Sequence, residues 1–104
     1  MRIVVPSNGD TLDSMVAERF ARADYFIVYD DTTNEFFAIP NGGLGAHGAG
    51  PRVVQMIARE GADVIIVPGM GQNAFSAATA AGIKPYLARP GTVRQNIEWF
   101  KRGS

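Results

Sequence analysis

The run Val64-Ile65-Ile66-Val67 constrains the fold of this chain more than any other feature. Its apolar residues do not alternate with polar ones, so a strand formed by this run must be covered on both faces. The run lies between two stretches with helical patterns, at residues 51–60 and 73–81. A buried strand between two helices is typical of a parallel sheet with helical crossovers, which is an α/β fold.

The first half of the chain predicts three strands joined by turns. Residues 2–6, 25–30 and 35–39 are rich in β-branched and aromatic side chains, and turn-forming sequences separate them. We therefore expect an antiparallel meander.

The segment between the first two strands predicts a short helix. Asp13 or Ser14 can cap it, and Val16 and Phe20 are spaced as i and i+4 on one helical face.

The second half predicts two helix–strand units and a final helix. The helices over residues 51–60 and 73–81 each end at a glycine, and a strand over residues 83–88 follows the second helix. Thr92 and Gln95 have the spacing of a capping box, which predicts the start of the last helix.

These elements predict one mixed five-stranded sheet with the strand order 3-2-1-4-5 and helices on both faces, because crossovers are right-handed. This order is the one found in ribonuclease H-like folds. The carboxyl ends of the first, third, fourth and fifth strands then lie at one edge of the sheet, where open α/β sheets bind ligands. We expect residues 1–104 to form a single domain of this kind.

Composition narrows the function classes. Ten basic and ten acidic residues cancel, so the charge gives no sign of nucleic acid as a partner. The chain has no cysteine, which excludes disulfides and clusters held by its own thiolates. No apolar run is long enough to span a membrane. Met1-Arg2 leads directly into a strand without the layout of a signal peptide, so we expect a cytoplasmic protein.

A glycine-rich segment separates the two halves and contains the only histidine, His47. Glycine costs more entropy to order than any other residue, so a ligand can be what orders residues 42–50. Pro51 fits the start of the following helix, and helix N-termini attract anions through their free N–H groups and the helix dipole. His47 is therefore the first candidate for a functional side chain.

Two interpretations of His47 stay open on the residues alone. As an ordinary loop residue, it would bond to a backbone carbonyl group. As a functional residue, it would ligate a metal or contact an anion. A single histidine does not complete a metal site, so His47 would serve a cofactor that brings its own inorganic ligands.

Other candidate cofactor-binding residues lie near the same helix start or directly after the fourth strand: Gly48, Ala49, Gly50, Arg52, Gly69, Met70 and Gly71. Arg52 is either a solvated side chain or a partner for bound negative charge. Met70 is either apolar lining or a soft thioether contact.

The glycines do not form a nucleotide-binding motif. Gly43, Gly45 and Gly48 match the dinucleotide fingerprint as a string, but the loop is too long, and Asp63 comes at the start of a strand rather than at its end. No lysine follows the glycines as in a Walker motif. No Ser-His-Asp set or pair of carboxylates is evident, which counts against catalysis.

Five stretches carry a family resemblance: residues 16–26, 47–50, 61–75, 80–84 and 91–93. Together they cover nearly the whole chain in order, and they resemble the dinitrogenase iron-molybdenum cofactor biosynthesis family. Ala21 and Asp24 differ from the glycine and proline that this family usually or often has there.

The resemblance implies a ribonuclease H-like fold and non-catalytic binding of the iron-molybdenum cofactor or its iron–sulfur precursor, in cluster assembly related to nitrogen fixation. His47 matches the histidine of the family motif and would be the metal ligand. The implied partners are the anionic cluster and cluster-assembly proteins.

Two other functions stay open. One is an enzyme that acts on a small phosphorylated or carboxylated metabolite at the same edge of the sheet. The other is a regulatory or interaction module without a ligand, whose contact surface Trp99 on the last helix would mark.

Overall fold

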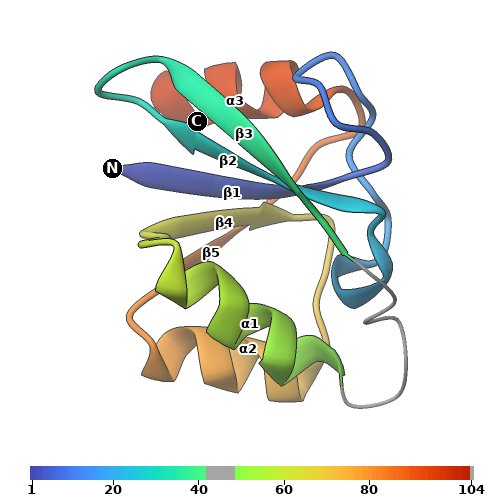
Figure 1. The fold of residues 1–104 in the computed structure, drawn as a ribbon, viewed down its shortest axis with the longest axis vertical. Coiled ribbons are helices and arrows are strands. Elements are labelled where there is room, and N and C mark those ends of the chain that lie inside the picture. Colours follow the sequence, from blue (N-terminus) through green and yellow to red (C-terminus); the bar gives the residue numbers. More distant parts are fainter. Residues whose placement is uncertain (42–48, 104) are drawn as a thin grey trace.

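The computed structural model describes residues 1–41 and 49–103. It contains one five-stranded sheet with the order β3-β2-β1-β4-β5, as the sequence predicts (Figure 1). The strands are β1 (Arg2–Ser7), β2 (Tyr25–Asp30), β3 (Glu35–Pro40), β4 (Val64–Val67) and β5 (Lys84–Leu87). The helices are the 3₁₀ helix η1 (Phe20–Arg22) and the α-helices α1 (Ala49–Arg59), α2 (Gln72–Ala80) and α3 (Val93–Lys101).

The strand directions place four carboxyl ends at one edge of the sheet. β2 is antiparallel to both β1 and β3, so β1 and β3 run in the same direction. β4 is parallel to both β1 and β5. The expected common edge for the ends of β1, β3, β4 and β5 is therefore confirmed.

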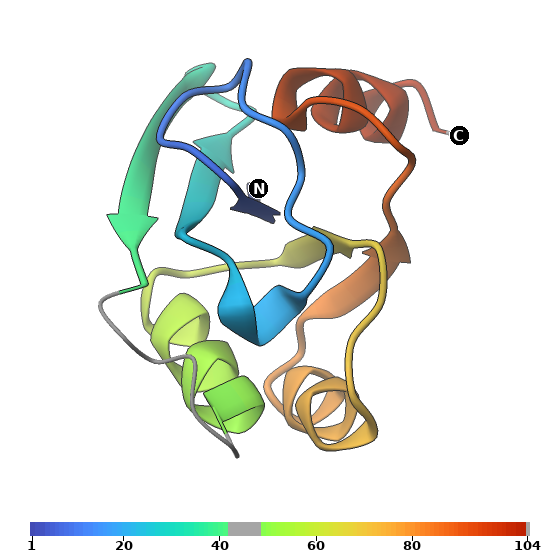
Figure 2. The ribbon, with the colours of Figure 1, turned by 90° about the vertical axis from the view of Figure 1, so that its right-hand side faces the viewer.

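Helices cover both faces of the sheet, α1 and α2 on one face and α3 on the other (Figures 1 and 2). Along β4, Ile65 and Val67 belong to the core that includes residues of α1 and α2, whereas Val64 and Ile66 belong to the core that includes residues of α3. All four β4 residues are buried. Coverage on both faces explains why this strand has no polar residue.

The helix expected after Asp13 or Ser14 is absent, and the expectation was wrong. Val16 instead donates its backbone N–H to the carbonyl oxygen of Gly91 at 3.1 Å, and Ala17 donates to that of Pro6 at 2.9 Å. These long-range backbone bonds hold the segment against β1 and the start of α3 in an extended form. Of the expected helix, only the turn η1 remains, beginning at the buried Phe20.

The other helices and strands agree closely with their predictions. α1 begins at Ala49, so Pro51 lies in the first helical turn, where a missing N–H leaves no helical bond unmade. The capping box is present, because the Thr92 side chain accepts from the N–H of Gln95 and the Gln95 side chain accepts from the N–H of Thr92.

Gly50 allows α1 and α2 to lie close together near their N-termini. A Cβ atom at Gly50 would lie 3.0 Å from the Cβ of Ala74 on α2, which is closer than most real Cβ contacts. The two helices lie side by side beneath the sheet (Figure 2). The small pair Gly50 and Ala74 therefore sets how closely the two N-termini approach.

We predict that Gly50→Val lowers the free energy of unfolding by about 1–3 kcal/mol, because a larger side chain overpacks this contact. Denaturant unfolding measures the change. The matched control is Gly69→Val, at a position where an added Cβ would have no atom within 4 Å.

A double-mutant cycle tests the cause. Ala74→Gly should cost less stability in the Gly50→Val background than in the wild type, because it removes the clashing Cβ. If the two losses of stability are strictly additive, the strain caused by Gly50→Val does not arise at the contact with Ala74.

Candidate functional site

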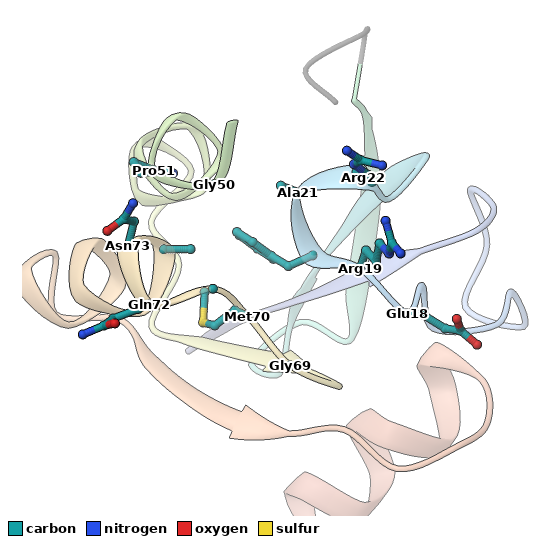
Figure 3. Close-up of a pocket in the computed structure, with 13 residues that line it drawn as sticks. Glu18, Arg19, Ala21, Arg22, Gly50, Pro51, Gly69, Met70, Gln72 and Asn73 are labelled. Atoms are coloured by element: carbon teal, nitrogen blue, oxygen red, sulfur yellow. The ribbon is translucent and has the colours of Figure 1, made fainter. Parts of the chain in front are cut away.

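A cavity of about 660 Å³ lies at the carboxyl edge of the sheet, between η1 on one side and the N-termini of α1 and α2 on the other (Figure 3). Its lining comes from residues 18–22, 50–51 and 69–74. This volume is within the usual range for small-ligand sites, roughly 300–1,000 Å³.

The helical side of the cavity is electropositive through its backbone. Gly50 and Pro51 come from the start of α1, where Pro51 itself has no N–H, and Gln72 and Asn73 come from the start of α2. The first N–H groups of a helix have no partner within the helix, and the dipole adds partial positive charge there. Neither first turn contains an acidic residue, and the N-cap residue of α2, Gly71, makes no side-chain cap. This side of the cavity is therefore suited to an anion.

Two glycines after β4 leave the cavity open. A Cβ atom at Gly69 or Gly71 would have no atom within 4 Å, and neither residue has a positive φ. The fold therefore requires glycine at neither position, for backbone conformation or for packing. Their effect is to let a ligand come close to the backbone after the strand.

Two arginines form the opposite side of the cavity. Arg19 and Arg22 are exposed, and neither has an ion-pair partner within 4.0 Å in residues 1–41 or 49–103. Between them, the buried Phe20 packs edge-to-face on Phe26 with ring centroids 5.7 Å apart. The aromatic contact fixes the turn, and the two cationic side chains extend from it (Figure 3).

Asn41, the residue after β3, ties this turn to the sheet. Its side-chain Nδ2 donates to the carbonyl oxygens of Ala21 at 3.0 Å and Ala23 at 2.6 Å. Its backbone N–H donates to the carbonyl oxygen of Asp24 at 2.9 Å. Its Oδ1 is buried and has no hydrogen-bond partner among the described residues. The Asn41 amide therefore holds the backbone on both sides of Arg22.

The structure brings four predicted site residues together at the cavity: Gly50, Gly69, Met70 and Gly71. Met70 is half-buried and packs against the core on the α1 and α2 face, so it serves at least as apolar lining. Ala49 is the first residue of α1. Arg52 is exposed on α1 and is not among the lining residues. His47 and Gly48 lie outside the described residues, so their roles stay predictions.

The sequence interpretation missed Arg19, Arg22 and Asn41. In the short helix expected around Phe20, Arg19 and Arg22 are three residues apart and share a face, but nothing in the local sequence places that face at the cavity. One signal was available, since Arg19 and Arg22 flank an aromatic core residue within a stretch that carries the family resemblance.

The cavity offers little for acid–base chemistry among the described residues. Glu18 is the only carboxylate in its lining there, and it points away from the two helix N-termini (Figure 3). The described residues contain no cluster of three or more histidine or acidic side chains suited to a metal ion.

Trp99 lies on the other side of the sheet, on α3. It is half-buried, and the guanidinium carbon of Arg89 lies 5.1 Å from its ring centroid. No helix in residues 1–41 or 49–103 is long and apolar enough to cross a membrane.

We predict that Asn41→Ala destabilises the fold by about 1–3 kcal/mol, because it removes the side-chain donors of two carbonyl groups. Amide hydrogen exchange should also quicken across residues 20–24. The matched control is Asn8→Ala, an exposed asparagine whose side chain makes no hydrogen bond to residues 1–41 or 49–103. Unchanged exchange in the Asn41→Ala variant would mean that the turn is held by Phe20 alone.

Solved structures with a similar fold cover almost the whole chain. The apo form of the orange protein from Desulfovibrio gigas is 39% identical, with a TM-score of 0.94 over 98% of this chain and 88% of that one. A Thermotoga protein described as a candidate NifB is 43% identical, with a TM-score of 0.87 and the same coverage.

An uncharacterized protein of Methanocaldococcus jannaschii is 26% identical over 107 residues, which is 99% of this chain and 87% of that protein. The dinitrogenase iron-molybdenum cofactor family matches residues 1–103. With a fold and a sequence that agree over this length, the chain is a member of the dinitrogenase iron-molybdenum cofactor family.

Proposed function

We propose that this protein is a non-catalytic carrier for an anionic metal–sulfur cluster, of the iron–sulfur or iron-molybdenum type or a precursor of it. The ligand would occupy the cavity between η1 and the N-termini of α1 and α2. The observation that carries the proposal is the convergence of two helix N-termini, without acidic residues in their first turns, on one open cavity.

The chemistry of the lining supports this ligand class. The chain has no cysteine, so it supplies no thiolate to a cluster. A cluster that carries its own sulfur ligands presents a negatively charged surface, which accepts hydrogen bonds from backbone N–H groups. The open backbone at Gly69 and Gly71 provides room for such a surface.

Family membership supports the same class of ligand, since the description of the family names the iron-molybdenum cofactor of dinitrogenase. The Desulfovibrio gigas relative is described in its apo form and the Thermotoga relative as a candidate NifB. Both descriptions are compatible with a protein that takes a ligand. A cytoplasmic location and cluster-assembly proteins as partners stay predictions.

We assign His47 the role of the single side-chain metal ligand. Gly48 and Ala49 would present backbone N–H groups, and Arg52 would add positive charge near the start of α1. His47 is the only histidine, and no cysteine competes with it for a metal.

An enzyme acting on a small anionic metabolite is the less supported alternative. Such an enzyme needs a positioned acid or base. Among the described lining residues, only Glu18 has a carboxylate, and it points away from the helix N-termini (Figure 3). The other alternative, a regulatory or interaction module without a ligand, does not account for the open cavity.

We predict that His47→Ala weakens cluster binding by about 10–100-fold, because losing a metal ligand costs at least as much as losing a residue that orients one. Anaerobic reconstitution followed by desalting and absorption spectra measures the cluster retained. Thermal unfolding should be unchanged. The control is Gln55→Ala, an exposed change on α1 outside the cavity.

Binding should also weaken as the pH falls below about 6.5, because a protonated imidazole does not ligate a metal. The His47→Ala variant should lack this pH dependence. Equal retention by wild type and variant, with equal stability, would remove His47 from the site and leave a backbone anion pocket. Failure of the wild type to retain any cluster would overturn the proposed function.

A further inference from the structure

We propose that Arg19 and Arg22 are the side chains that bind the negative charge of the ligand in this cavity, and that they select a compact anion with at least two negative charges. The inference rests on the proposed function, because it concerns the same cavity. It adds the charge of the ligand and the side chains that recognise it.

The first argument is the unbalanced charge of the cavity. Its described lining holds two arginines and one carboxylate, Glu18, and no carboxylate lies within 4.0 Å of either guanidinium group among the described residues. Arginine is always charged and offers several donors in a planar fork that matches the oxygens or sulfurs of an anion. Two such groups without a described acidic partner leave positive charge free for a ligand.

The second argument is that the positive charges come from two sides. Arg22 lies on η1 and Arg19 directly precedes it, whereas the N-termini of α1 and α2 lie across the cavity (Figure 3). An anion with one localised charge interacts strongly with only one of these sides. A compact polyanion, whose charge is spread over its surface, interacts with both at once.

The third argument is that the backbone carrying the arginines is fixed before a ligand binds. Phe20 packs into the core between them, and Asn41 bonds to the carbonyl oxygens of Ala21 and Ala23 on either side of Arg22. Fixing the backbone before binding lowers the entropy cost of association. Asn41 is therefore a positioning residue for Arg22.

The arginines also remain accessible from solvent. Arg19 and Arg22 also line an adjoining hollow of about 450 Å³, together with Asn8 and residues 15–18. Both side chains are exposed, so the guanidinium groups stay hydrated without a ligand and accessible to one that enters from solvent.

The test compares two charge-matched double variants. Arg19→Gln with Arg22→Gln removes both charges from the cavity. Arg59→Gln with Arg102→Gln removes the same charge from exposed positions at the ends of α1 and α3, outside the cavity lining. Arg19→Lys with Arg22→Lys keeps the charge and changes only the donor geometry.

Two probes separate this inference from the proposed function. One is a synthetic 4Fe–4S cluster with thiolate ligands, which is a dianion, added under anaerobic conditions. The other is inorganic pyrophosphate, a polyanion without a metal. Titration calorimetry at low and at high salt gives the affinity of each variant for each probe.

We expect the glutamine double variant to bind both probes about 10–100-fold more weakly than the wild type at low salt. Its affinity should also depend less on salt, because fewer charges contribute. The affinity of the Arg59 and Arg102 control for each probe should stay within about twofold of the wild-type affinity, since those charges are screened at a distance. The lysine double variant should bind both probes almost as tightly as the wild type.

Each other outcome has one meaning. Equal binding by the wild type and the glutamine variant overturns the inference, and so does an equal loss in the Arg59 and Arg102 control. Binding of pyrophosphate without binding of the cluster supports the inference and overturns the proposed function. Failure of the wild type to bind either probe overturns both.

Discussion

The burial of β4 on both faces is the constraint on which the rest of the structure depends. β4 pairs in parallel with β1 and β5, so the chain enters and leaves it through helical crossovers. Both crossovers move in the same direction across the sheet, and their common handedness places α1 and α2 on one face (Figure 1). The N-termini of both helices then fall at the edge where β3 and β4 end. The position of the cavity follows from this topology, and the close contact of Gly50 with Ala74 brings the two N-termini together.

Electrostatics then limits what this edge can bind. Helix N-termini and two arginines contribute positive charge, and among the described lining residues only Glu18 opposes them. In the function we propose, a chain without cysteine holds its cluster mainly by hydrogen bonds and charge rather than by metal–thiolate bonds. Such a complex forms and dissociates without protein thiolates leaving the metal. This behaviour fits a carrier better than an enzyme with a permanent cofactor.

Local patterns and chirality were enough to predict most of the fold. The non-alternating run at β4, the glycines that end two helices and the capping box at Thr92 each act within a few residues, and right-handed crossovers fixed the strand order. The segment before η1 was predicted wrongly, because Val16 and Phe20 suggest a helix locally while backbone bonds to Gly91 and Pro6 outweigh that tendency. The position of Arg19 and Arg22 at the cavity was also not predicted. The turn that carries Arg22 is held by Asn41, which is distant in sequence and gives no local signal.

The most direct measurement is a map of paramagnetic broadening on the nitrogen-15-labelled wild-type protein, with the synthetic 4Fe–4S cluster added anaerobically. If the cavity is the binding site, the amide signals of residues 19–22, 50 and 69–73 should broaden most, because they line it. The signals of residues 98–101 on α3, which is on the other face of the sheet, should stay sharp (Figure 1). Strongest broadening at α3 or β5, or binding without any localised broadening, would contradict the assignment of the cavity as the cluster site.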